Sequence, residues 1–138
     1  MHLVFGRDEL VCQWVCERIG MQIAPPYTAI GGTRDRQSLC AGTVFNCWNG
    51  ANIDITLATD GGLSRGAIRG IYHYMFVQLG ALRATAHTRR SNKKMRELLP
   101  RLGFTKEPEG VLRNFYGPHK ADDAFVFALF PENARKWL

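Results

Sequence analysis

The residues Asp60, Gly61 and Gly62, followed by Ser64 and Arg65, have types and spacing that could hold an anionic group. The two glycines break the chain between a strand pattern and a helix pattern, and Ser64 is a suitable N-cap for that helix. The first turn of a helix has free backbone N–H groups and the positive end of the helix dipole, which favour phosphate. The turn is therefore predicted to bind phosphate, unless it is a plain strand–turn–helix connection. It matches neither the dinucleotide-binding motif nor the P-loop.

Hydrophobic periodicity predicts the elements on both sides of this turn. Residues 52–58 alternate, with Ile53, Ile55 and Leu57 on one side, which predicts a strand with one buried face. After the turn, apolar residues recur at helical spacing as far as Gly80, a suitable helix stop. These residues are Ile68, Ile71, Tyr72, Met75, Phe76 and Leu79. The unit is a strand, a glycine turn and a helix of roughly four turns.

The composition is that of one globular domain covering residues 1–138, with 46% hydrophobic and 22% charged residues. No apolar run is long enough to cross a membrane, and the first ten residues do not resemble a signal peptide. The four cysteines form no C-x-x-C pair, so we expect reduced structural thiols and no metal site. Reduced thiols favour a cytoplasmic location as an expectation.

The net charge of +6 permits an anionic partner: nucleic acid, a phosphorylated cofactor or an acidic protein. The densest basic cluster contains Arg89, Arg90, Lys93 and Lys94, which could contact nucleic-acid phosphates. The other interpretation of this cluster is a solvated helix start with surplus charge.

The whole chain predicts an α/β fold with the order β-α-β-β-β-α-β-α-β-β, a mixed sheet and helices on both of its faces. The predicted strands cover 1–7, 27–34, 39–48, 52–58, 82–88, 110–116 and 124–130, and the predicted helices cover 8–19, 64–80 and 91–102. Strands 27–34, 39–48 and 52–58 are expected to form an antiparallel meander. Strand 82–88 should run parallel to strand 52–58, and the continuously apolar strand 124–130 should lie inside the sheet.

Some local features carry further expectations. The first helix is predicted to bury Leu10, Val11, Trp14, Val15 and Ile19. Asn49-Gly50 indicates a two-residue hairpin. Pro100 lies inside the third helix, where it should cause a kink or a tightened last turn.

Two sequence runs in the C-terminal half, together with this order, resemble the GNAT family of acetyl-CoA-dependent N-acyltransferases. Residues 92–104, NKKMRELLPRLGF, follow the family's pattern of an Asn that opens a helix ending in Gly-Phe. Residues 109–113, EGVLR, match the E-G-x-x-R that follows in some branches. The closing residues 135–138, RKWL, are similar to small phage and prophage members. The resemblance covers essentially the whole chain, and it implies the cytoplasm of a bacterium or of a phage-infected host cell.

The resemblance implies that acetyl-CoA binds where the fourth and fifth strands splay apart. The pantetheine arm would contact main-chain groups near Leu57 and Ala58, and the pyrophosphate would lie on the glycine turn. The residues implied for that turn are Thr59, Gly61, Gly62, Leu63 and Ser64, with Arg65 compensating for the charge of Asp60. Asn92 would contact the pantetheine or cap its own helix. The turn departs from the family pattern because Thr59 replaces a Gln or Arg.

The resemblance also implies acetyl transfer to a primary amine by direct attack on the thioester. Asp54 is the first candidate for the general base, and Tyr116 and His87 are further acid or base candidates. A backbone N–H near Leu57 would stabilise the oxyanion. Leu99 stands where the family often has a tyrosine acid.

The acceptor is left open among a protein amine, a small amine and aminoacyl-tRNA. Two alternative functions remain: a phage-type protein of this fold that modifies a nucleic-acid base, and a non-catalytic interaction protein. Exposed edge strands would permit a homodimer.

Overall fold

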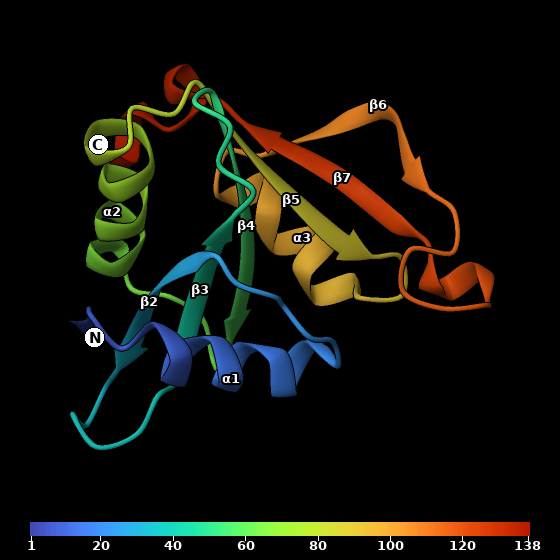
Figure 1. Ribbon diagram of the computed structural model, residues 1–138. Helices are drawn as coiled ribbons and strands as arrows, with labels where there is room; N and C mark the ends of the chain where they lie inside the picture. The colour runs from blue at the N-terminus through green and yellow to red at the C-terminus, as the bar shows by residue number, and fades with distance from the viewer.

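A computed structural model describes all 138 residues and contains one seven-stranded mixed sheet with three α-helices (Figure 1). The strands are β1 (His2–Val4), β2 (Tyr27–Thr33), β3 (Ala41–Asn46), β4 (Asn52–Thr59), β5 (Arg83–Arg89), β6 (Thr105–Leu112) and β7 (Ala124–Leu129). The helices are α1 (Asp8–Ile19), α2 (Arg65–His73) and α3 (Lys93–Arg101), and α2 continues into a π-helical turn, Tyr74–Gln78. Short 3-10 turns cover Lys120–Asp122, Pro131–Asn133 and Arg135–Trp137. The predicted order of elements is confirmed.

The sheet has the strand order β1-β2-β3-β4-β5-β7-β6. Only the β4–β5 pair is parallel, because α2 carries the chain across to the next strand, and every other neighbour is antiparallel. The predicted meander, the parallel pair and the interior position of β7 are all confirmed. None of the helices has the length and hydrophobicity needed to cross a bilayer.

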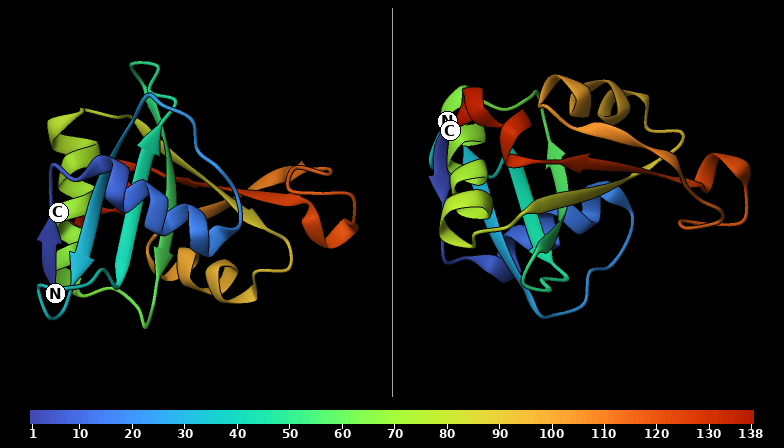
Figure 2. Two further views of the ribbon diagram at one scale, coloured as in Figure 1. Left: turned by 60° about the horizontal axis from the view of Figure 1, so that its bottom comes forward. Right: turned by 90° about the horizontal axis from the view of Figure 1, so that it is seen from above.

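Strands β4 and β5 separate towards their C-terminal ends (Figure 2). Their register runs from Asn52 opposite Arg83 to Ile55 opposite Ala86 and stops there. Strand β4 continues to Thr59 while β5 continues to Arg89, so both strands run on without pairing to one another. This confirms the expected splay between the fourth and fifth strands and leaves backbone edges open to a ligand.

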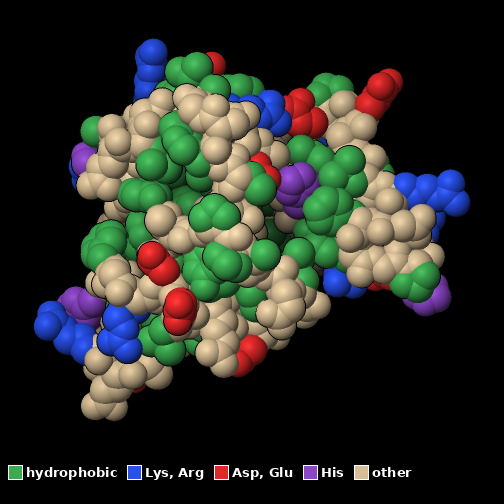
Figure 3. Space-filling view, viewed as in Figure 1, with side chains coloured by type: hydrophobic (Ala, Val, Ile, Leu, Met, Phe, Trp, Pro, Cys, Tyr) green, Lys and Arg blue, Asp and Glu red, His purple; other side chains and the backbone are tan.

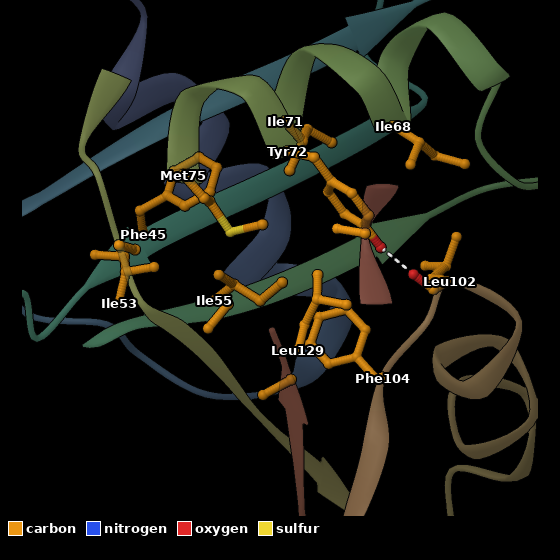
Figure 4. Close-up of a cluster of buried hydrophobic side chains, with 14 of the residues drawn as sticks. Phe45, Ile53, Ile55, Ile68, Ile71, Tyr72, Met75, Leu102, Phe104 and Leu129 are labelled. Atoms are coloured by element: carbon orange, nitrogen blue, oxygen red, sulfur yellow. Dashed lines mark hydrogen bonds between the residues drawn. The ribbon is translucent and has the colours of Figure 1, made fainter. Parts of the chain in front are cut away.

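Two hydrophobic clusters pack on opposite faces of the sheet. Helix α1 packs on one face, where Val11 and Val15 share a cluster with Val44 and Ala58. Helices α2 and α3 contribute to the larger cluster, whose sheet residues include Phe45, Ile53, Ile55 and Leu129 (Figure 4). The Tyr72 hydroxyl donates a buried hydrogen bond of 2.7 Å to the carbonyl oxygen of Leu102, so it joins α2 to the end of α3. Helices therefore cover both faces, as predicted.

Leu10 was predicted to be buried, and this is wrong because its side chain is 47% exposed. The buried stripe of α1 is centred on Val11, Cys12, Val15 and Cys16, which places Leu10 at the solvent edge of the helix. Cys12 and Cys16 are buried on the side of α1 that faces the sheet, whereas Leu10 is not.

The strand predicted at 110–116 is also misplaced, because β6 is Thr105–Leu112. This edge strand pairs with β7 at Thr105–Lys106 and again at Val111–Leu112, with a register shift between. The irregular part contains Pro108, which only an edge strand tolerates, and Glu109 at a left-handed φ of 57°. The bulge removes the regular alternation by which a strand is recognised in a sequence.

The connection between β3 and β4 is longer than Asn49-Gly50 suggested. Strand β3 ends at Asn46 rather than at residue 48, and the loop covers residues 47–51. The Asn49 side chain accepts from the backbone N–H groups of Ala51 and Asn52, at 2.9 and 2.7 Å. At the end of α3, Leu102 and Gly103 donate to carbonyls three residues earlier, which is the tightened last turn expected beside Pro100.

Candidate active site

The splay between β4 and β5 opens a cleft of about 260 Å³. Leu57 of β4, His87 and Arg89 of β5, Asn92 and Tyr116 are among its lining residues. A second pocket adjoins the cleft between the glycine turn and α3, and Arg18, Leu57 and Asn92 line both. Figure 3 shows hydrophobic side chains across the middle of one face of the molecule, with Lys and Arg mainly near its margins. The two pockets provide a continuous path from the glycine turn to the space between the strands.

The glycine turn presents a row of unused backbone donors. No N–H group from Gly61 through Gly66 donates to an acceptor in the protein. Gly61 and Gly62 have φ values of 87° and 91°, in the left-handed region that glycine adopts without steric cost. The Ser64 hydroxyl caps α2 by accepting from the Ala67 N–H at 3.1 Å. The turn therefore combines free N–H donors with a helix start, an arrangement that favours an anionic group.

Arg34, just beyond the end of β2, holds the other side of this turn. Its guanidinium donates to the carbonyl oxygens of Asp60, Gly61 and Gly62 at 3.2 to 3.3 Å. Thr59 adds a hydrogen bond of 2.7 Å from its hydroxyl to the Gly62 carbonyl. These carbonyls are thus held on the Arg34 side, leaving the N–H groups of the turn without protein partners. Arg34 belongs to no local motif that would predict this role, because its partners lie 26 to 28 residues away in the sequence.

Asp60 is neutralised by a residue other than the expected one. Arg18, in the last turn of α1, binds the Asp60 carboxylate through Nε at 3.3 Å and Nη2 at 3.0 Å. Arg65 instead donates to the Lys136 carbonyl at 3.0 Å and lies 5.1 Å from the centre of the Trp137 ring. The expectation that Arg65 compensates for Asp60 is therefore wrong in this structure, and Arg18 has that role.

The other residues implied for cofactor binding are distributed along the path. Leu57, Ala58, Thr59, Gly61, Gly62 and Asn92 line the second pocket. Leu63 packs against the larger hydrophobic cluster, so only its backbone is available to a ligand at the turn. The Asn92 Oδ1 accepts from the Met95 N–H at 3.1 Å and caps α3, while the same residue lines both pockets.

His87 and Tyr116 both line the cleft, and Phe115 contacts each of them. The His87 ring stacks on Phe115 with centroids 5.1 Å apart, and Phe115 in turn contacts Tyr116. Burial lowers the pKa of His87, although the charge of Asp54 acts in the opposite direction. Burial raises the pKa of Tyr116, and Arg89 opposes this shift. At neutral pH the site therefore contains a neutral imidazole, able to accept a proton, and a protonated phenol, able to donate one.

Asp54 is not among the residues that line the cleft. The Asn52 amide donates to the Asp54 carboxylate at 2.9 Å, and the Thr85 hydroxyl donates to the Asn52 side chain at 2.6 Å. Arg83 donates to Thr85 at 2.9 Å and forms an ion pair of 2.7 Å with Glu107. This chain of polar contacts crosses from β4 to β6 and fixes the orientation of the carboxylate.

Part of the basic cluster is already paired with carboxylates. Arg89 binds Asp122 at 2.8 Å, and Lys93 lies 3.9 Å from Glu97. Leu99, at the position of the family's tyrosine acid, is buried and lines the cleft. No group of three or more His, Cys, Asp and Glu side chains is arranged to hold a metal.

No protein-family model and no curated protein sequence matches this chain. Solved structures do match it. A point mutant of spermidine N-acetyltransferase SpeG from Vibrio cholerae has a TM-score of 0.65 and 16% identity, covering 91% of this chain and 75% of that chain. The same enzyme in complex with manganese ions has a TM-score of 0.66 and 15% identity, covering 80% of this chain and 68% of that chain. N-acetyltransferase PseH from Campylobacter jejuni has a TM-score of 0.59 and 18% identity, covering 78% of this chain and 70% of that chain.

These similarities agree with the strand order, the single parallel pair and the splay between β4 and β5. The similarity to small phage members stays a prediction. The protein has the GNAT fold of N-acetyltransferases.

Proposed function

We propose that this protein is an acetyl-CoA-dependent N-acetyltransferase that acetylates a primary amine. The observation that carries the proposal is the cleft between β4 and β5, which leads to the row of free N–H groups from Gly61 to Gly66. The amine acetyltransferases with the same fold support an amine acceptor. The acceptor could be a protein amine, a small amine or an aminoacyl-tRNA.

The residues of the path fit acetyl-CoA, which supplies an acetyl group activated as a thioester. The turn would bind the pyrophosphate through the N–H groups of Gly61, Gly62 and the residues that follow, held in place by Arg34. Beyond Ile55 and Ala86, the facing edges of β4 and β5 have no partner strand, so backbone groups near Leu57 are available to the pantetheine and to the oxyanion. Asn92 lies where the two pockets join.

We propose His87, rather than Asp54, as the general base. His87 lines the cleft and is neutral at pH 7, since burial lowers its pKa. Asp54 does not line the cleft, but its negative charge acts on His87 and favours the imidazolium that forms after proton transfer. Asp54 is thus proposed as a positioning residue that acts through His87.

Tyr116 is proposed as the acid. It would replace the tyrosine acid that the family often has at the position of Leu99. Transfer forms a bond from the acceptor nitrogen to the acetyl carbon and breaks the bond from that carbon to sulfur. One proton passes from the nitrogen to His87, and one passes from the Tyr116 hydroxyl to the sulfur. The raised pKa of Tyr116 keeps that proton in place at neutral pH until it is needed.

Calorimetric titration of the protein with acetyl-CoA and with CoA tests the proposal first. We expect dissociation constants in the micromolar range, and no binding at millimolar ligand would overturn the proposal. Thiol release in the presence of a panel of amines then measures turnover. His87→Gln should lower kcat by about 100-fold, the usual contribution of a general base, while CoA affinity is retained.

The alternative of nucleic-acid modification uses Arg89, Arg90, Lys93 and Lys94 as phosphate contacts, and two of them are paired with carboxylates. Salt-dependent binding to DNA or RNA would test it. A non-catalytic interaction protein is the remaining alternative, and it would bind CoA weakly or acetylate no amine.

A further inference from the structure

The charged side chains that line the cleft between β4 and β5 are all basic. They are Arg18 and Arg89, which line the cleft together with the titratable His87, whereas no Asp or Glu lines it. Asp60 and Asp122, the partners of the two arginines, lie outside this lining. The cleft lining therefore contains two guanidinium groups, each paired with a carboxylate from outside the lining.

Arg89 is oriented so that part of its guanidinium stays available. Its Nη1 donates to Asp122 at 2.8 Å, and its central carbon lies 4.9 Å from the Tyr116 ring centre. Its Nε and Nη2 have no acceptor in the protein. The Asp122 carboxylate is shared with the His119 N–H at 3.1 Å, which anchors it in the loop before β7. The arginine is thus fixed on two sides and keeps donors for a ligand beside the proposed acid Tyr116.

A polyamine does not match this lining. Each of its ammonium groups would need a carboxylate or a ring of polar acceptors, and the cleft lining contains no Asp or Glu to pair with it. A carboxylate or phosphate, in contrast, forms charge-assisted hydrogen bonds with a guanidinium. Nearby positive charge also lowers the pKa of an incoming ammonium, which helps it lose the proton that blocks attack.

We infer that the acceptor is a primary amine that carries its own anionic group, a carboxylate or a phosphate, and that Arg89 binds this group. The inference rests on the proposed acetyltransferase function. It separates this protein from the spermidine N-acetyltransferases that share its fold.

The test compares amines that differ only in charge, with thiol release measured at saturating acetyl-CoA. The probes are para-(aminomethyl)benzoate, its neutral amide, para-(aminomethyl)phenyl phosphate and spermidine. We expect kcat/KM for the better of the two anionic amines to exceed that for the amide by about tenfold or more, through a charge-assisted pair. Spermidine should be the poorest acceptor. The carboxylate and phosphate probes show which of the two anions is preferred.

Variants separate anion binding from anchoring of the loop. Arg89→Gln should remove the preference for the anionic amine, mainly through KM, and Arg89→Lys should keep part of it. Asp122→Asn frees Arg89 from its protein partner, so the preference should be kept or increased. If Arg89 acted only by anchoring the loop, Asp122→Asn would lose the preference as Arg89→Gln does. Lys93→Gln, outside both pockets, is the matched control for lost charge.

Equal kcat/KM values for the anionic and neutral amines, or a preference for spermidine, would overturn the inference while leaving an acetyltransferase. If none of the probes is acetylated, their binding to the CoA-saturated protein is compared by NMR titration. Tighter binding of an anionic probe supports the inference, and equal or undetectable binding overturns it. Failure of the proposed function is recognised separately, since the protein then does not bind CoA.

Discussion

Arg18 binds both carboxylate oxygens of Asp60, with Nη2 3.0 Å from Oδ2 and Nε 3.3 Å from each oxygen. The pair joins the last turn of α1 to the turn that precedes α2. The Arg18 guanidinium also lies 3.5 Å from the centre of the Trp14 ring, which fixes its plane. An acidic residue inside a turn with free N–H donors is thereby neutralised by an arginine that itself lines both pockets.

Replacing Asp60 with Asn should strengthen CoA binding. The substitution removes a negative charge beside the proposed pyrophosphate position and frees Arg18 to contribute a positive one. An exposed ion pair is worth up to about 1 kcal/mol, so we expect a gain of up to about fivefold in affinity and little change in stability. Arg18→Gln should weaken binding by a similar factor. Calorimetric titration with CoA measures both, and weaker binding by Asp60→Asn would show that the pair instead shapes the turn.

Gly62 and Gly66 provide a matched pair of alanine substitutions around the same turn. A Cβ at either position meets no atom within 4 Å, so any effect comes from the backbone alone. Gly62 has a φ of 91°, where an L residue is strained by about 1 kcal/mol or more, and Gly62→Ala should lower stability and CoA affinity together. Gly66 lies in the first turn of α2, where alanine is the better helix former.

Gly66→Ala should therefore raise the free energy of unfolding, by about 0.5 to 1 kcal/mol. Urea denaturation of the two variants beside the unchanged protein measures both effects. Equal destabilisation by the two substitutions would contradict the backbone explanation.

Sequence periodicity predicted the elements whose environment is regular. The β2-β3-β4 meander, the crossover through α2 and the interior strand β7 each repeat one local pattern over several residues, and the structure confirms them. Strand β6 was misplaced because Pro108 and Glu109 interrupt its pairing with β7. Leu10 was misplaced because periodicity gives the face of a helix more reliably than the edge of that face.

For the candidate site, the sequence indicated the residues of the turn but not the residues that support it. Arg18 contacts Asp60 across 42 residues, and Arg34 contacts Gly62 across 28. Neither arginine belongs to a local motif, so only the folded sheet brings them to the turn. His87 lies in a polar part of β5, and its position on the cleft lining depends on where β4 and β5 separate.

Tyr72→Phe should destabilise the protein by about 1 to 2 kcal/mol. The substitution removes the hydroxyl that donates to the Leu102 carbonyl at 2.7 Å in a buried environment, where water cannot replace it (Figure 4). Tyr74→Phe is the matched control, because its hydroxyl bonds to Thr28 at the same distance in an exposed position. The free energy of unfolding in urea should fall less for Tyr74→Phe. Equal losses of unfolding free energy would show that the buried hydrogen bond of Tyr72 stabilises the protein no more than the exposed one of Tyr74.

The pH dependence of His87 provides a test of its pairing with Asp54 that does not depend on turnover. Burial lowers the pKa of His87 below the 6.5 of an unperturbed histidine, so the folded protein binds fewer protons than the unfolded chain between those two values. Stability should therefore fall as pH decreases from 6.5 towards the folded pKa, and His87→Gln should remove that part of the decline. Asp54 opposes the shift, since its negative charge favours the imidazolium.

Asp54→Asn should consequently lower the pKa of His87 further and leave the imidazole a weaker base. The ring protons of His87, assigned by their absence in His87→Gln, report this in an NMR titration. In the proposed mechanism the acidic limb of kcat/KM follows the same pKa, so that limb should also move to lower pH in Asp54→Asn, together with a decrease in the plateau rate. If the His87 titration is the same with and without the Asp54 carboxylate, the two residues are not coupled, and Asp54 supports β4 only through its hydrogen bond with Asn52.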